Sequence, residues 1–147
     1  MTPHRPIVEK WIVETMASYP PASVPFLAGE SDPFRNPVGH AVRQSLTTMF
    51  EQLLGDMNGE SLDVALDGIV RVRAVQDLSP SEAIGFVFRL KAILRELAPE
   101  EDQIALADRV DRLALMAFDK YAQCREQLAE IRIKEWRRGF GSRQASG

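Results

Sequence analysis

An uninterrupted apolar repeat near the C-terminus constrains the fold of this chain more than any other feature. No glycine or proline occurs from Glu100 to Arg138, and the acidic residues after Pro99 favour a helix start there. Apolar residues recur in this run every three or four positions, which is the spacing of one face of an α-helix. We call this face the main stripe: Leu106, Val110, Leu113, Ala117, Tyr121, Cys124, Leu128 and Ile131.

The length of this helix predicts that it projects from its own domain. At 1.5 Å per residue, residues 100–138 would form a helix roughly 57 Å long, whereas a compact chain of this size is only about 40 Å across. The apolar stripe continues into the projecting part and needs a partner there. We therefore predict a homodimer with Leu128 and Ile131 at the contact, and with Tyr121 and Trp136 in the dimer or effector interface. A kink that folds the helix back is the alternative.

A short corner, Ser79-Pro80-Ser81-Glu82, is predicted to begin the preceding helix. The serine can cap free backbone N–H groups, proline suits the first helical position, and the glutamate can bond back to the cap. Gly85 leaves a flat strip on this helix, and Phe88 falls outside its apolar line. We place both in the dimer or effector interface. Alternatively, Gly85 has no role in an interface and only reduces the stability of the helix by about 1 kcal/mol relative to alanine.

A charged residue interrupts the apolar line of the helix predicted at about 61–77. Leu62, Leu66 and Ile69 define that line, and Arg73 and Gln76 continue it. A buried guanidinium needs a carboxylate or several carbonyl partners, because an unpaired buried charge costs several kcal/mol. We predict that Arg73 is a structural clamp onto the irregular segment before residue 38, which contains Arg35 and Asn36. A ligand or anion pocket formed by Arg73, Gln76, Arg35 and Asn36 is the alternative.

The remaining sequence fits a single helical domain over residues 1–138. A first helix is predicted at residues 5–19, followed by an irregular proline-rich segment up to Pro37. Another helix runs from Pro37 and is predicted to end at Asn58-Gly59 in the left-handed conformation. The last helix should span residues 100–138, and residues 139–147 form a predicted disordered tail.

Composition and motifs argue against several classes of function. The net charge of −3 argues against general nucleic-acid binding. The single Cys124 excludes an intramolecular disulfide and favours a reducing compartment, and the chain has no membrane-spanning apolar run or signal peptide. We therefore expect a cytoplasmic protein without a membrane span. The chain has no phosphate-binding glycine loop, paired metal motif or nucleophile elbow, so we expect no catalytic residues, cofactor or metal, and no enzyme.

Three stretches carry a resemblance to a known family. Asp32-Pro33-Phe34-Arg35-Asn36-Pro37-Val38-Gly39, residues 67–76 and residues 79–83 are similar to the RsbRD-type N-terminal domain, the sensor module of RsbT co-antagonist proteins in bacterial stressosomes. The likeness runs from about Trp11 to Tyr121. It implies an all-α, dimeric, globin-like bundle without haem, with about five or more helices and a long projecting C-terminal helix. The family is thought to pass a signal along this helix to a STAS domain, which the present chain does not contain.

Three functional hypotheses follow. The leading hypothesis is a non-enzymatic signalling or sensor domain that dimerises and relays a signal through its C-terminal helix to a protein effector, either a STAS domain or another partner in trans. The second is a globin-like sensor that binds a small ligand or cofactor near Arg73. The third is an adaptor subunit of a larger complex, which would use the basic residues after Arg125.

Overall fold

The computed structural model describes residues 4–18, 37–76 and 78–146, with side chains up to Gly139 apart from that of Val38. These residues form helices and no strand, which confirms the predicted all-α fold with a long C-terminal helix. The described helices are α1 (His4–Met16), α3 (Pro37–Leu54), α4 (Gly59–Val75), α5 (Pro80–Leu97) and α6 (Gln103–Ser146).

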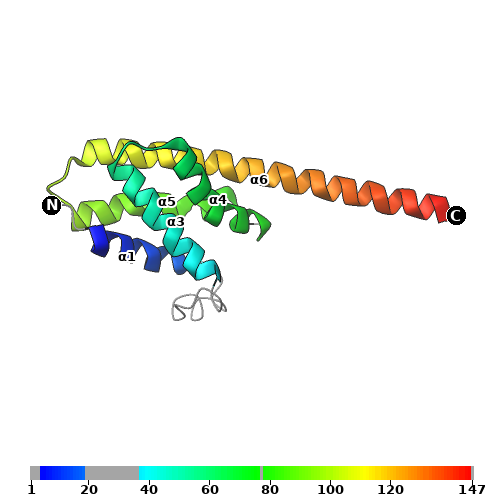
Figure 1. Cartoon of the computed structure of the whole chain (residues 1–147), viewed down its shortest axis with the longest axis horizontal. Helices are drawn as coiled ribbons and strands as arrows, with labels where there is room; N and C mark the ends of the chain where they lie inside the picture. The colour runs from blue at the N-terminus through cyan, green and yellow to red at the C-terminus, as the bar shows by residue number, and fades with distance from the viewer. Residues whose placement is uncertain (1–3, 19–36, 77, 147) are drawn as a thin grey trace.

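The body of the molecule is built around the first half of α6. Both α5 and α4 pack on α6, α3 packs on α4, and α1 packs on α5 and α3. Figure 1 shows α6 as one unbroken helix whose first half lies along the body and whose second half extends beyond it. Its 44 residues correspond to about 66 Å. The predicted projection is thus confirmed, and the alternative of a helix folded back is wrong.

Apolar lines on each helix meet in one core. The predicted line of α4 is buried at Leu62, Leu66 and Ile69. Trp11 of α1 is fully buried in this core, where its indole N–H donates a hydrogen bond of 2.7 Å to the carbonyl oxygen of Phe86. The two rings stack with their centroids 6.3 Å apart. This contact fixes α1 against α5.

The predicted start of α5 is confirmed. Ser79 is the N-cap, with its Oγ accepting a hydrogen bond of 3.3 Å from the backbone N–H of Glu82. The Glu82 carboxylate accepts one of 3.2 Å from the backbone N–H of Ser79. With Pro80 at the first helical position, this capping box ends the turn after α4 and sets the direction of α5.

The predicted end of α3 is wrong. The residue in the left-handed region is Met57, with φ of 55°, whereas Gly59 is the first residue of α4. Asn58 has an extended backbone, and its side-chain oxygen accepts a hydrogen bond of 3.0 Å from the N–H of Ser61. Asparagine is as favourable at an N-cap as after a helix. In this chain Asn58 is the N-cap of α4.

The ends of the first and last helices also differ from the prediction. Helix α1 ends at Met16, and α6 begins at Gln103, where Asp102 caps the N–H of Ala105 at 3.1 Å. Helix α6 continues through Ser146, beyond the predicted end at Arg138. Disorder in the last residues stays a prediction. The predicted irregular segment lies outside the described residues except at Pro37, where α3 begins.

Candidate functional site

Helix α6 changes from a buried to an exposed helix within a few residues. The main stripe is buried from Leu106 to Cys124, Leu128 is partly buried against the core, and every residue from 131 to 139 is exposed. Of the predicted interface residues, Ile131 and Trp136 lie on the projecting part. Tyr121 instead lies within the body, with its hydroxyl bonded to the carbonyl oxygen of Leu78.

A second apolar line runs along the opposite side of α6, and the sequence analysis missed it. Its large members are well exposed: Leu115 at 67%, Phe118 at 46%, Ile133 at 51% and Trp136 at 68%. Together with Ala122 and Ala129 they share one face at steps of three, four or seven residues. We call this line the outer stripe. The spacing of three or four residues is a signal that could have predicted this line. The sequence analysis considered only the main stripe, which contains more apolar residues.

The outer stripe begins beside α5. The Lys91 ammonium lies 5.6 Å from the centroid of the Phe88 ring and 2.5 Å from a carboxylate oxygen of Asp111. Asp111 lies one turn before Leu115 on α6, so the Lys91–Asp111 ion pair places this part of α5 beside the start of the outer stripe. Phe88 is exposed, and no atom of the described residues would lie within 4 Å of a Cβ added at Gly85. Both predicted interface residues of α5 therefore lie at the surface.

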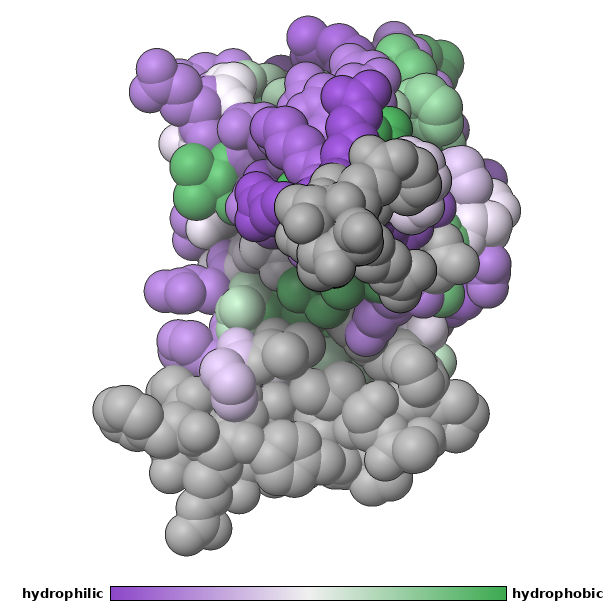
Figure 2. Space-filling model, turned by 90° about the vertical axis from the view of Figure 1, so that its right-hand side faces the viewer, coloured by the Kyte–Doolittle hydropathy of each residue, from purple (hydrophilic) through white to green (hydrophobic). Residues whose placement is uncertain are grey.

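The projecting end carries mainly positive charge around its apolar residues. Arg132, Lys134, Arg137 and Arg138 are exposed there, with Glu135 among them. Figure 2 views the molecule from the end toward which α6 projects, and shows hydrophilic side chains gathered around smaller apolar patches. A partner at this end would therefore have to complement both apolar and basic groups.

Several polar contacts join α6 to α4 just before α6 leaves the body. Arg125 donates a hydrogen bond of 3.1 Å to the carbonyl oxygen of Ala74. Gln127 accepts one of 3.2 Å from Arg71. These contacts lie within two turns of the point where α6 becomes fully exposed, so α4 and the α4–α5 corner determine how α6 leaves the body.

A semi-buried ion cluster strengthens the same junction. The Lys120 ammonium lies 2.8 Å from Asp63 and 3.7 Å from Asp67, and Arg71 bonds Asp67 at 2.8 Å. The hydrogen bond from Arg71 lowers the pKa of the Asp67 carboxyl, and the hydrogen bond to Asp63 raises the pKa of the Lys120 ammonium. The Lys120 side chain is only 11% exposed at this junction.

Arg73 lies fully buried at 0% exposure where α1, α4 and α5 meet. Its guanidinium donates hydrogen bonds to the carbonyl oxygens of Thr15 at 3.3 Å and Glu82 at 3.2 Å, and to Ser18 Oγ at 2.6 Å. It also lies 5.2 Å from the centroid of the Phe86 ring. The sequence analysis predicted that a buried Arg73 would need either a carboxylate or several carbonyl partners. Among the described residues, carbonyl oxygens are its main partners.

The four residues predicted to surround this point are not all brought together. Gln76 is exposed and forms the C-cap of α4, so it does not continue the buried line. The helix ends at Val75, and residue 76 no longer follows the helical path. Arg35 and Asn36 lie outside the described residues, and so does the segment before residue 38 that Arg73 is predicted to contact, except Pro37. No group of three or more His, Cys, Asp or Glu in the described part of the chain could hold a metal ion.

These features match a known family of helical domains. A family model described as the RsbT co-antagonist protein RsbRD N-terminal domain matches residues 5–136, from α1 to the exposed Trp136 of α6. The chain belongs to this family. An RsbRD N-terminal domain is associated with signalling, and the matched range includes the first part of the projecting helix.

The chain is also similar to an uncharacterised protein of Archaeoglobus fulgidus. The two are 25% identical over 134 residues, which cover 88% of this chain and 82% of that protein. No solved structure matches the chain significantly. None of the described helices of this RsbRD N-terminal domain is both long and apolar enough to cross a membrane.

Proposed function

We propose that this RsbRD N-terminal domain is a non-enzymatic signalling module that forms a homodimer and relays a signal along α6 to a protein effector. The effector would be a STAS domain or another signalling protein that binds in trans. Membership in a signalling-associated family supports the general role. The arrangement of α6 supports the dimer and the relay.

The exposure of the outer stripe is the main support for the proposed homodimer. It extends from Leu115 to Trp136, roughly 32 Å along the helix, and its large apolar side chains are exposed on both the body and the projecting part. Two identical stripes packed side by side would bury their apolar surfaces over most of that length. Phe88 would extend the contact on one side, and the open surface at Gly85 would let a neighbouring helix approach closely.

A second copy packed on the outer stripe would leave the opposite face of the projecting helix free to bind an effector. Ile131 and Ile133 are two positions apart, so they point about 200° apart around the helix. With Ile133 in the dimer, Ile131 and its basic neighbour Arg138 face elsewhere, whereas Arg132 lies one turn before Trp136, beside the outer stripe. We assign this opposite face, together with Leu128, to an effector with an apolar and acidic surface.

The junction between α4 and α6 supports the relay. Arg73 fixes the end of α4 to α1 and to the start of α5, while Arg125 and the Lys120 cluster fix α4 to α6. A change in the position of α1 or of the α4–α5 corner would therefore alter the direction in which α6 leaves the body. Such coupling requires an element with two stable arrangements.

Size-exclusion chromatography with light scattering tests the dimer. We expect twice the chain mass at micromolar concentration, and a chain that ends at Arg125 should be mostly monomeric because it lacks half of the outer stripe. A strictly monomeric full chain would contradict the proposal.

The effector is tested separately by pulldown with the full chain and with the chain that ends at Arg125. A partner specific to α6 should be retained only by the full chain. Retention of the same partners by both chains would argue against a contact at the projecting end.

A further inference from the structure

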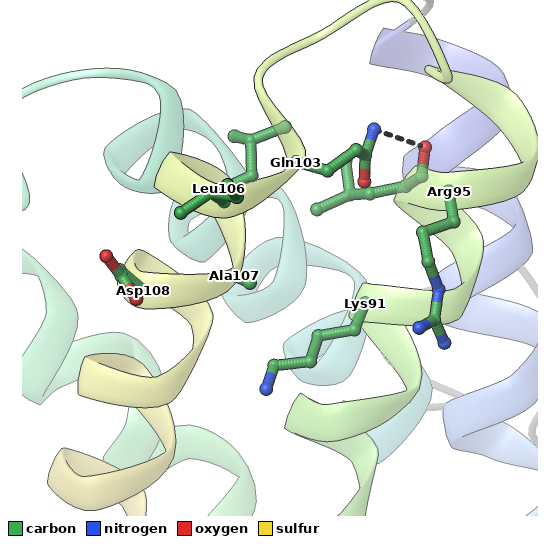
Figure 3. A pocket seen from close by; sticks show the side chains of 8 residues that line it. Lys91, Arg95, Gln103, Leu106, Ala107 and Asp108 are labelled. Atoms are coloured by element: carbon green, nitrogen blue, oxygen red, sulfur yellow. Dashed lines mark hydrogen bonds between the residues drawn. The ribbon is translucent and has the colours of Figure 1, made fainter.

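A cavity of about 300 Å³ lies in the α5–α6 hairpin, far along the chain from Arg73 and from the projecting end of α6. Its wall combines residues from the last turns of α5 and the first turns of α6. The lining residues that matter most here are Leu94, Arg95, Ile104, Leu106 and Asp108. Figure 3 shows Arg95, Leu106 and Asp108 around a space between the two helices, close to the turn that joins them.

The inner wall of this cavity is apolar and belongs to the core. Leu94 and Leu106 are buried, whereas Ile104 is 78% exposed at the mouth. The exposed Ile104 side chain and the apolar wall beside it form a surface on which a short hydrocarbon chain could pack. The Gln103 amide is held by the carbonyl oxygen of Ala98 at 2.6 Å, which fixes the first turn of α6 at the cavity.

The rim carries one cation whose charge is not balanced nearby. Lys91 also lines the cavity, but its ammonium pairs with Asp111 at 2.5 Å. Among the described residues, Arg95 has no hydrogen bond or ion pair through its side chain. Asp108 lies on the other helix, and Figure 3 places its carboxylate on the opposite side of the cavity from Arg95. The site therefore favours an anionic group at the Arg95 side, and the acid at the far side disfavours a dianion.

We propose that this cavity binds a small organic carboxylate with a medium-length apolar chain. The carboxylate would pair with the Arg95 guanidinium, and the chain would cover Leu94, Ile104 and Leu106. A ligand here would contact both arms of the hairpin. This gives the domain an input site distinct from the buried clamp at Arg73, and the inference does not depend on dimerisation.

Titration calorimetry of the full chain with octanoate tests the proposal. We expect one octanoate per chain, with octanol and acetate each bound at least about tenfold more weakly, because one lacks the charge and the other the chain. Arg95→Gln and Ile104→Asp should each weaken octanoate binding by about tenfold or more. Asp108→Asn should leave the affinity unchanged or increase it.

Two control variants separate this site from general surface effects. Arg112→Gln removes an exposed cation elsewhere on α6, and Phe118→Ser removes an exposed apolar group of the outer stripe; neither should change octanoate binding. Circular dichroism should show that the exposed Arg95 and Ile104 variants remain folded. Octanoate affinity unchanged in Arg95→Gln, equal affinity for octanol, or no binding at millimolar octanoate would overturn the proposal.

Discussion

The hydroxyl of Tyr121 donates a hydrogen bond to the backbone carbonyl oxygen of Leu78. This contact joins the middle of α6 to the turn between α4 and α5, next to the capping box that starts α5. It lies in the buried part of α6, one turn before Cys124, the last buried residue of the main stripe. The body of the domain and the helix that leaves it are therefore connected through the α4–α5 corner.

Removing this hydroxyl tests the connection. Tyr121→Phe keeps the ring in the core but leaves the Leu78 carbonyl, which is partly buried, without its partner. We expect the free energy of unfolding to fall by about 1–2 kcal/mol, measured by urea denaturation. An unchanged unfolding midpoint would mean that water replaces the hydroxyl at no cost.

Replacing Arg73 should have the largest effect of any single polar substitution. Arg73→Met removes the guanidinium hydrogen bonds to Thr15, Ser18 and Glu82 that hold α1, α4 and α5 together, so we expect a loss of about 3 kcal/mol or more. Arg73→Lys should recover only part of this loss, because an ammonium cannot reproduce the planar set of donors. The matched control is Arg71→Met on the exposed side of α4, which should cost no more than about 1 kcal/mol. Equal losses for Arg73→Met and Arg71→Met would refute the clamp.

The outer stripe predicts which substitutions separate the dimer. Phe118→Asp or Trp136→Asp places a charge in the apolar contact between two copies, so each should shift the light-scattering mass toward the monomer at micromolar concentration. Val64→Asp changes an equally exposed apolar residue on α4 and should leave the dimer intact. Should Phe118→Asp and Trp136→Asp both remain fully dimeric, the contact must lie on another face.

Stability should fall in acid partly through Asp67. The Arg71 guanidinium holds the pKa of this carboxyl below its ordinary value of 3.8 in the folded state. The unfolded chain therefore binds a proton first as the pH falls, so the stability from Asp67 is present above that value and is lost as the pH drops through the folded pKa. Urea unfolding at about pH 7 and about pH 3 should show a smaller acid-induced loss for Asp67→Asn than for the parent chain. An identical pH dependence would exclude this role.

Two helical glycines should respond in opposite ways to a methyl group. Among the described residues nothing lies within 4 Å of a Cβ at Gly85, so Gly85→Ala should stabilise the monomer fold by up to about 1 kcal/mol. A Cβ at Gly68 would lie 2.6 Å from Ser45 Oγ, where α3 crosses α4. Gly68→Ala should therefore gain less than Gly85→Ala, or lose stability. Thermal unfolding compares the two variants, and an equal gain would show that Ser45 moves aside freely.

Local sequence signals were reliable where one side chain has one favourable role. Ser79, Pro80 and Glu82 occupy the positions predicted for them, because capping depends only on neighbours within one turn. Asn58 was misassigned because asparagine suits both the end of one helix and the start of the next. Gln76 was misassigned because helical periodicity cannot indicate that α4 ends one residue earlier.

The sequence by itself determined the helical class, the unbroken α6 and the burial of Arg73, because these follow from periodicity, from the absence of glycine and proline, and from the position of a charge on an apolar line. Only the tertiary structure decided which face of α6 stays exposed. The main stripe and the outer stripe have the same periodicity, and the packing of α4 and α5 covers one and leaves the other. The partners of Arg73 and the cavity beside Arg95 likewise depend on residues brought together from different helices, a relationship that no local pattern contains.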